Sequence, residues 1–190
     1  MKRITILLFL VASTLSASAQ TLREAIKEMP DEVFPLLTKN DRLDFIDYLA
    51  SNAKAEVKNK LGTTSEMTAL TDDYAHIRMT EVSEVSMKLL PRGEAKIICM
   101  VSTCKVDSLQ DSEISFFDLQ WKPLDAKQFI NLPPTNRFQY LVLSPQSTDL
   151  QLIEQEWVLV PDGEKQMEVE KIVRVLKWNG EAFTMSQSND

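Results

Sequence analysis

Apolar residues recur at helical spacing in the first third of the chain. Thr21 and Glu24 have the spacing of a capping box, which predicts a first helix that ends before Pro30. The stretch from Pro30 to Pro35 is typical of a turn that contains one short helical turn. We therefore expect a short helix and a turn before the next periodic segment.

A second, longer helix is predicted from Asn40 to about residue 61. Asn40 suits the N-cap and Gly62 suits a left-handed C-cap, and Lys58 and Lys60 fit the negative end of the helix dipole. One apolar stripe has the spacing of a helix face and is expected to face the core: Phe45, Ile46, Leu49, Ala53, Val57 and Leu61.

From about Ile77 the apolar positions alternate with a period of two, which indicates strands. Ile77–Leu89 is either one long, bulged strand or two short ones. Ala95–Thr103 is apolar on both faces, as in a central strand. The remaining predicted strands are Glu113–Trp121, Phe138–Leu143, Leu150–Val160, Met167–Trp178 and Glu181–Met185, with hairpin turns at Pro161-Asp162-Gly163 and Asn179-Gly180.

This order of elements predicts an α+β fold. N-terminal helices, at about residues 21–61, should pack on a mostly antiparallel β-sheet formed by the rest of the chain. No low-complexity linker divides residues 20–190, so we expect a single domain there. A repeat built on Trp121, Trp157 and Trp178 is the alternative.

Residues 1–19 have the order of a secretory signal peptide. Lys2 and Arg3 precede an apolar run, Ile4–Ala12, that is too short to span a bilayer. The small residues Ala17-Ser18-Ala19 predict cleavage before Gln20. No cysteine lies near that point for lipid attachment, and no later stretch approaches transmembrane length. We expect an exported protein without membrane insertion.

Composition narrows the possible partners. The chain of 190 residues has 21 basic and 28 acidic residues, a net charge of −7, and the predicted leader holds two of the basic residues and no acidic one. Such a protein repels phosphate backbones and anionic headgroups, so we expect neither nucleic acid nor a membrane surface as partner. The apolar fraction of 44% is enough for a core.

Cys99 and Cys104 fall on one predicted strand. Five residues of strand separate their Cα atoms by roughly 16 Å and direct the side chains to opposite faces. A disulfide needs Cα atoms within about 7 Å, so we expect two unbridged thiols. A bridge across an unseen turn is the alternative.

Chemical motifs are weak throughout. His76, the one histidine, follows Asp72 and Asp73, but three groups would leave a metal ion short of ligands, and an Asp pair before a strand is typical of a turn. The sequence has no Gly-x-Ser-x-Gly motif that would supply a nucleophilic serine to work with His76.

The other candidate motifs are also explained without a catalytic or binding role. Two Ser-x-x-Lys matches, Ser51–Lys54 and Ser102–Lys105, lack the companion motifs of penicillin-recognising enzymes. The pairs Glu154/Glu156 and Glu168/Glu170 are expected on solvated strand faces. The four glycines all serve turns or caps, which leaves none for a phosphate loop. We therefore assign no catalytic, cofactor-binding or metal-binding residue and expect no cofactor.

Three distinctive stretches carry a resemblance: Met29–Tyr48, Ser65–Tyr74 and Asp111–Asp118 with Trp121. Together they resemble an exported Bacteroidales family of unknown function, DUF3256, over essentially the whole mature chain. The family has no assigned activity, so the resemblance supplies no site residues. It implies the envelope of a Gram-negative cell: the periplasm is the expected compartment, and the extracellular space is the alternative.

Two hypotheses for function come from different classes. The first is a non-catalytic envelope protein that binds an envelope protein or a glycan through its sheet face or an edge strand. The second is a hydrolase that cleaves glycan or peptide with a carboxylate pair, which requires two carboxylates within about 10 Å in a shared cleft. Ligand and oligomeric state lie beyond the sequence.

Overall fold

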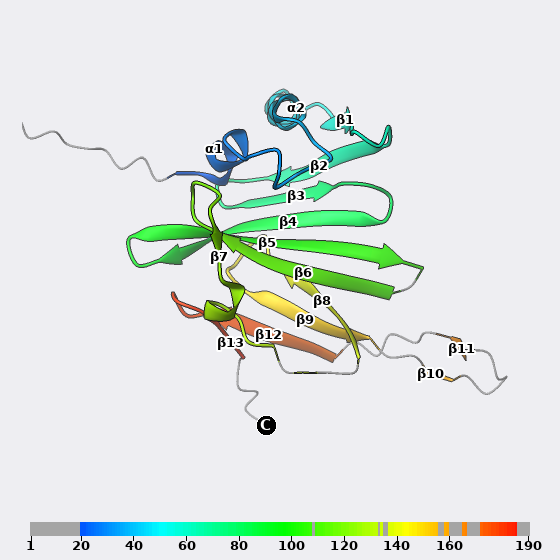
Figure 1. Cartoon of the computed structure of the whole chain (residues 1–190), viewed down its shortest axis with the longest axis vertical. Helices are drawn as coiled ribbons and strands as arrows, with labels where there is room; N and C mark the ends of the chain where they lie inside the picture. The colour runs from blue at the N-terminus through cyan, green and yellow to red at the C-terminus, as the bar shows by residue number, and fades with distance from the viewer. Residues whose placement is uncertain are drawn as a thin grey trace, which may run out of the picture.

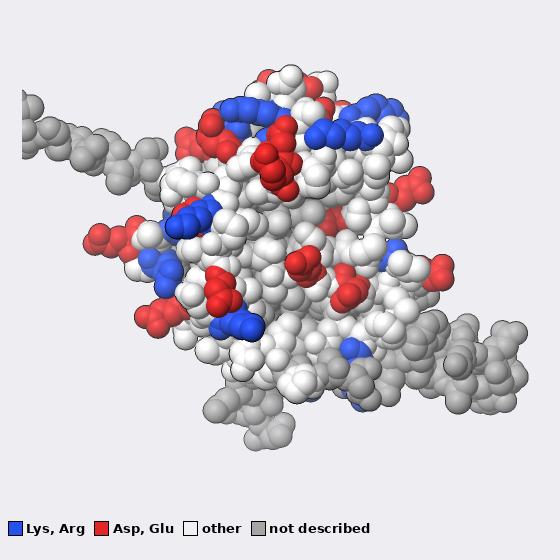
Figure 2. Space-filling view, in the orientation of Figure 1, with Lys and Arg blue, Asp and Glu red and all other residues white. Residues whose placement is uncertain are grey.

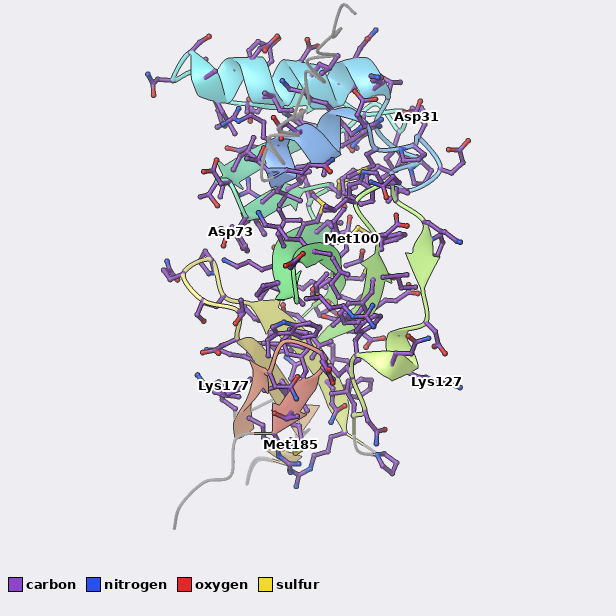
Figure 3. All side chains as sticks on the ribbon, turned by 90° about the vertical axis from the view of Figure 1, so that its left-hand side faces the viewer. Asp31, Asp73, Met100, Lys127, Lys177 and Met185 are labelled. Atoms are coloured by element: carbon purple, nitrogen blue, oxygen red, sulfur yellow. The ribbon has the colours of Figure 1, made fainter. Side chains whose placement is uncertain are left out.

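The computed structural model describes residues 20–107, 109–132, 134, 137–155, 158–159, 165–166 and 172–185. These residues form mostly antiparallel β-sheet with small N-terminal helices. The helices lie at one end of the long axis, a seven-stranded sheet in the middle and a four-stranded sheet at the other end (Figure 1). From the side, Asp31 lies near the helical end, Met100 in the middle and Met185 near the opposite end (Figure 3).

Two short helices precede the strands, and each begins with a capping box. In α1 (Leu22–Lys27), the Thr21 side chain accepts from the Glu24 amide and the Glu24 carboxylate accepts from the Thr21 amide, as predicted. In α2 (Lys39–Ala50), Thr38 and Asp41 make the same exchange. These contacts satisfy amides that have no partner within the helix.

The predicted helix from Asn40 to residue 61 is wrong at both ends. Thr38, not Asn40, is the N-cap, and the helix ends at Ala50, where the Ser51 hydroxyl donates back to the Asp47 carbonyl and Asn52 has a φ of 55°. Short polar side chains of this kind compete with the helix for backbone partners. Residues 56–58 are a strand, and Gly62, with a φ of 78°, lies in the turn after it.

The seven-stranded sheet follows chain order, and every neighbouring pair is antiparallel. The predicted segment Ile77–Leu89 is two strands, and Ala95–Thr103 lies within β5, between two neighbours, as predicted. The strands are β1 (Glu56–Lys58), β2 (Thr64–Leu70), β3 (Tyr74–Arg78), β4 (Ser83–Arg92), β5 (Ala95–Val106), β6 (Leu109–Phe117) and β7 (Pro123–Leu124).

Strands β2 and β6 of this sheet differ from prediction. β2 was not predicted, because its Thr, Ser and Glu positions hide the alternation of buried Ser65 and Met67 with more exposed neighbours. β6 begins at Leu109 and ends at Phe117 rather than Trp121. The chain turns there: the Trp121 amide donates to the Asp118 carbonyl, and Trp121 has a φ of 64°.

The last third of the chain forms a separate four-stranded sheet in the order β13-β12-β9-β8, so the prediction of one sheet is wrong. Strand β8 meets β6 through a side chain, because the Leu141 amide donates to Ser112 Oγ at 3.1 Å. The elements of this part are the 3-10 helix η1 (Ala126–Gln128) and strands β8 (Phe138–Leu143), β9 (Leu150–Gln155), β10 (Val158–Leu159), β11 (Lys165–Gln166), β12 (Ile172–Trp178) and β13 (Phe183–Met185).

The predicted hairpin turns have different outcomes. β10 and β11 pair with each other, while the turn predicted at residues 161–163 lies outside the described residues. At Asn179-Gly180 the loop has four residues rather than two, since Trp178 pairs with Phe183. The Asn179 amide donates to the Ala182 carbonyl across that loop.

The seven-stranded sheet contributes to two hydrophobic clusters, one on each face. Met87 and Met100 face the helices, which supply residues such as Ile26 and Phe45 to the first cluster. Residues of opposite parity, such as Phe116, pack on the four-stranded sheet in the second cluster. Alternation along β4, β5 and β6 therefore connects both clusters through the same strands.

Candidate functional site

A groove of about 420 Å³ opens on the helix-side face of β4, β5 and β6. The strand register builds its floor: Val85 on β4 pairs with Ser102 on β5, which pairs with Glu113 on β6. The next row along the strands contains Ser83, Cys104 and Asp111, which also line the groove. Because alternate residues share a face, three neighbouring strands present a continuous floor.

The turn between the two helices forms the groove wall. Val33, Pro35 and Leu36 line it, while the Phe34 side chain points into the helix-side core and is buried. The Lys60 amide donates to the Leu36 carbonyl at 3.0 Å, which ties the wall to the turn after β1. This wall supplies apolar surface opposite the polar residues of β5 and β6.

Arg42 on α2 fixes the wall from inside the protein. It is fully buried, and its guanidinium donates to the Leu37 carbonyl at 3.1 Å and to the Met29 carbonyl. It also pairs with Asp31 at 2.9 Å. One rigid, planar group thus holds both ends of the segment that forms the wall. Sequence reasoning missed this residue because a helical Arg is ordinarily exposed.

The two cysteines are unbridged, as predicted, and lie on opposite faces of β5. Cys99 is buried between the sheets, and burial raises the pKa of its thiol. Cys104 is exposed and lines the groove. Because Cys99 is buried and Cys104 is exposed, Cys104 is the thiol of the pair that a reagent can reach.

Asp111 and Glu113 are the groove residues that the sequence analysis did not single out. They lie two positions apart on β6, so their side chains share one face. In the middle of the face shown in Figure 2, acidic side chains stand among mostly uncharged residues, while charges of both signs gather toward the edges. The strand was predicted to begin only at Glu113, because residues 110–113 are all polar and show no apolar alternation.

His76 lies on the opposite face of the sheet, away from this groove. Thr68 Oγ1 is 2.5 Å from His76 Nδ1, and His76 Nε2 is 3.4 Å from the Glu84 carboxylate. The hydrogen bond from His76 lowers the pKa of Glu84, against the effect of its partial burial. The three side chains bridge β2, β3 and β4, so the contact joins neighbouring strands.

Asp72 and Asp73 do not join His76 in a cluster. The Asp72 carbonyl accepts from the Leu22 amide at 2.7 Å, and the Asp73 carboxylate pairs with buried Lys88 at 2.9 Å. Partial burial would raise the pKa of Asp73, but hydrogen bonds from Lys88 and Thr71 outweigh it and hold the pKa below its usual range. Among the described residues, no group of three His, Cys, Asp or Glu side chains has metal-binding geometry.

The two Ser-x-x-Lys matches do not bring a serine and a lysine together in one site. Ser51 is the C-cap of α2, and Lys54 pairs with Glu56 at 2.6 Å. Ser102 lines the groove, whereas Lys105 belongs to the opposite parity of β5.

Of the two glutamate pairs that were expected on solvated strand faces, the structure describes only Glu154. Glu154, expected on a solvated face, is buried, where it accepts from Gln139 at 2.9 Å and lies 3.6 Å from Arg137 and 3.8 Å from Arg174. Cations from the two neighbouring strands or their ends thus compensate the buried charge. Glu156, Glu168 and Glu170 lie outside the described residues.

Comparison with known proteins places the chain in a family. Residues 14–160 match the family described as "Protein of unknown function (DUF3256)". The chain belongs to this family. A search of the curated proteins finds no match.

A solved structure shares the fold. It is described as "Structure of a domain of an uncharacterized protein from Porphyromonas gingivalis W83", and it matches with a TM-score of 0.70 and 20% identity over 87% of this chain and 98% of that chain. Among the helices of the described part, none has both the length and the apolar character needed to cross a membrane.

Proposed function

We propose that this member of the DUF3256 family is a non-catalytic envelope protein that binds a segment of another envelope component in the groove over β4, β5 and β6. The groove is the observation that carries the proposal. It is concave, it combines an apolar wall with a polar floor, and Arg42 holds the wall in place. Binding sites generally combine these features.

The proposed compartment is the periplasm, with the extracellular space as the alternative. Support comes from the order of charged, apolar and small residues in positions 1–19, which are proposed to be removed on export. Residues 20–190 are proposed to form one domain. The strands shared by the two hydrophobic clusters support this unit, since neither cluster is complete without them.

A blocked groove tests the binding proposal. A bulky maleimide on Cys104 fills part of the floor, and buried Cys99 stays unreacted in the folded protein. The immobilised wild-type chain, with and without the adduct, is incubated with the detergent-solubilised native envelope. We expect a saturable component to bind the free protein and to bind the adduct at least about tenfold more weakly.

The Cys104→Ser variant is the matched control. It receives the same reagent but has no accessible thiol, so it should bind like the untreated wild type. Equal binding by the adduct and by the free protein would contradict the proposal, provided circular dichroism shows that the adduct is folded.

A carboxylate-dependent hydrolase is the second candidate, because Asp111 and Glu113 line one groove. Alternate residues on a strand are roughly 7 Å apart at Cα and share one face, so both carboxylates open into the same groove, as a carboxylate pair for glycoside hydrolysis requires. The test compares hydrolysis of peptidoglycan and peptide by wild type, Asp111→Asn and Glu113→Gln. Loss of measurable hydrolysis in both variants would favour this candidate over binding alone.

A further inference from the structure

The groove continues beyond its polar floor into a second hollow. This second hollow has a volume of about 330 Å³ and is lined by Leu109, Val106 and Phe138, among others. Cys104 and Asp111 line both hollows, so the two share a border. The combined surface, which we call the extended groove, runs from the wall at residues 33–36 to the hairpin between β5 and β6.

Apolar surface is present at both ends of the extended groove. Val33 and Leu36 are half-buried at the wall. At the other end Val106 is 64% exposed and Phe138 is 44% exposed. Large apolar side chains that gather beside a hollow are typical of a contact surface for a partner.

The centre of the extended groove is acidic. Asp111 and Glu113, whose side chains share the groove face of β6, are among its lining residues. No Lys or Arg belongs to the described residues that line either hollow. Because the whole chain also carries a net charge of −7, the field over this floor attracts cations.

We infer that the extended groove binds an extended segment of another exported protein in which a Lys or Arg lies between apolar residues. The cation would lie over Asp111 and Glu113, and the apolar neighbours would contact the wall at one end and Val106 and Phe138 at the other. This inference rests on the proposed function and specifies the partner of the same groove. Crossing three strands and the second hollow requires about five extended residues.

A sugar fits this surface less well. A sugar would need an exposed aromatic face beside the polar groups of the floor, but Phe34, the aromatic residue in the first hollow, is only 2% exposed. The exposed aromatic residue, Phe138, lies in the second hollow, at the apolar end of the extended groove. A protein segment with a basic residue between apolar residues instead matches the order of apolar, acidic and apolar surface along the extended groove.

Selection from a random peptide library tests the inference. A displayed library of twelve-residue peptides is selected on the folded wild-type chain and sequenced, and the enriched peptides are measured by calorimetry. We expect enrichment of Lys or Arg flanked by apolar residues. We further expect affinity at least about tenfold weaker for Glu113→Lys than for wild type, and weaker binding in high salt.

Asp44→Lys is the matched control, since it makes the same charge change at an exposed position of α2 outside the extended groove. It should leave peptide affinity within about twofold of wild type. Should Glu113→Lys fail to fold, Asp111→Asn and the Cys104 adduct test the same floor.

Two results would overturn the inference in distinguishable ways. Enriched peptides that are acidic or uncharged, yet still lose affinity in Glu113→Lys and in the Cys104 adduct, would overturn the basic-segment inference and leave the groove as the binding site. Peptide binding that is equal in wild type, Glu113→Lys and the adduct, together with equal envelope binding by the adduct, would overturn both.

Discussion

Two basic residues, Arg42 and Lys88, show how single side chains organise this fold from within. Arg42 uses its planar fork to hold the carbonyls of Leu37 and Met29, whereas the ammonium of Lys88 pairs with Asp73 and donates to the Pro145 carbonyl at 3.0 Å. Both are compensated, which burial of a charge requires. From sequence, charged residues of this kind are expected on the surface, so only the structure shows that Arg42 and Lys88 are buried.

The Asp73–Lys88 pair predicts a pH dependence of stability. The pKa of Asp73 is lowered in the folded protein, so its contribution is present above the unfolded value of about 4 and is lost as pH falls through the folded pKa. We expect Asp73→Asn to lower the free energy of unfolding at pH 7 by about 1 kcal/mol, because Lys88 loses its charge partner while Asp73 itself is half exposed.

Urea unfolding at pH 7 and at pH 3 measures this effect. The difference between wild type and Asp73→Asn should shrink at low pH, where Asp73 is increasingly protonated. The neighbouring Asp72→Asn variant is the control for loss of one carboxylate. A difference that is unchanged at pH 3 would show that the carboxylate charge is not the cause.

At the scale of elements, local signals identified most strands but misplaced the end of α2. The predicted strands agree with β4, β5 and β8 and with the last two residues of β3, because each of these strands buries one or both faces. The stripe from Phe45 to Leu61 fits a helix in spacing alone. Its second half belongs to a turn and to β1, since the Ser51-Asn52 pair ends the helix.

The N-cap of α2 gives a prediction at this scale. Thr38→Ala removes the hydroxyl that accepts from the Asp41 amide, which should lower the free energy of unfolding by about 1 kcal/mol. Asn40→Ala changes an exposed position inside the first turn and should have an effect of less than about 0.5 kcal/mol. Chemical denaturation of both variants decides between the two caps. Equal losses would contradict the assignment of Thr38.

At the scale of the whole molecule, long-range contacts hold the layers together. Trp121 Nε1 donates to the Ala25 carbonyl at 2.7 Å and so joins α1 to the turn after β6. Trp178 Nε1 donates to the Pro91 carbonyl at 2.7 Å and joins the four-stranded sheet to the end of β4. The recurrence of tryptophan near strand ends thus has a structural explanation in these two residues.

Phe116 gives the prediction for the layered arrangement. Its ring lies 4.8 Å from that of Phe129 and 6.4 Å from that of Phe183, between the two sheets. Phe116→Ala should lower the free energy of unfolding by about 3–5 kcal/mol, since it leaves a cavity in this cluster. Leu61→Ala, at a side chain that is 65% exposed, should change it by less than about 0.5 kcal/mol.

Both variants are measured by thermal unfolding in two backgrounds, one that keeps only Trp121 and one that keeps only Trp178, with the other tryptophans replaced by Phe. The fluorescence of the remaining tryptophan reports the transition in each background. We expect the two probes to report one transition in the wild type, because both clusters share β4, β5 and β6. Separate transitions would contradict the single-domain proposal.

The sequence by itself determined the local features: the Thr21 capping box, the strands β4, β5 and β8, and the opposite faces of Cys99 and Cys104. Each depends on chain periodicity or on contacts between near neighbours. Tertiary structure decided the division into two sheets, the burial of Arg42 and Lys88, and the meeting of the wall at residues 33–36 with Asp111 and Glu113. These depend on strand order and register between distant segments, which a period along one chain does not specify.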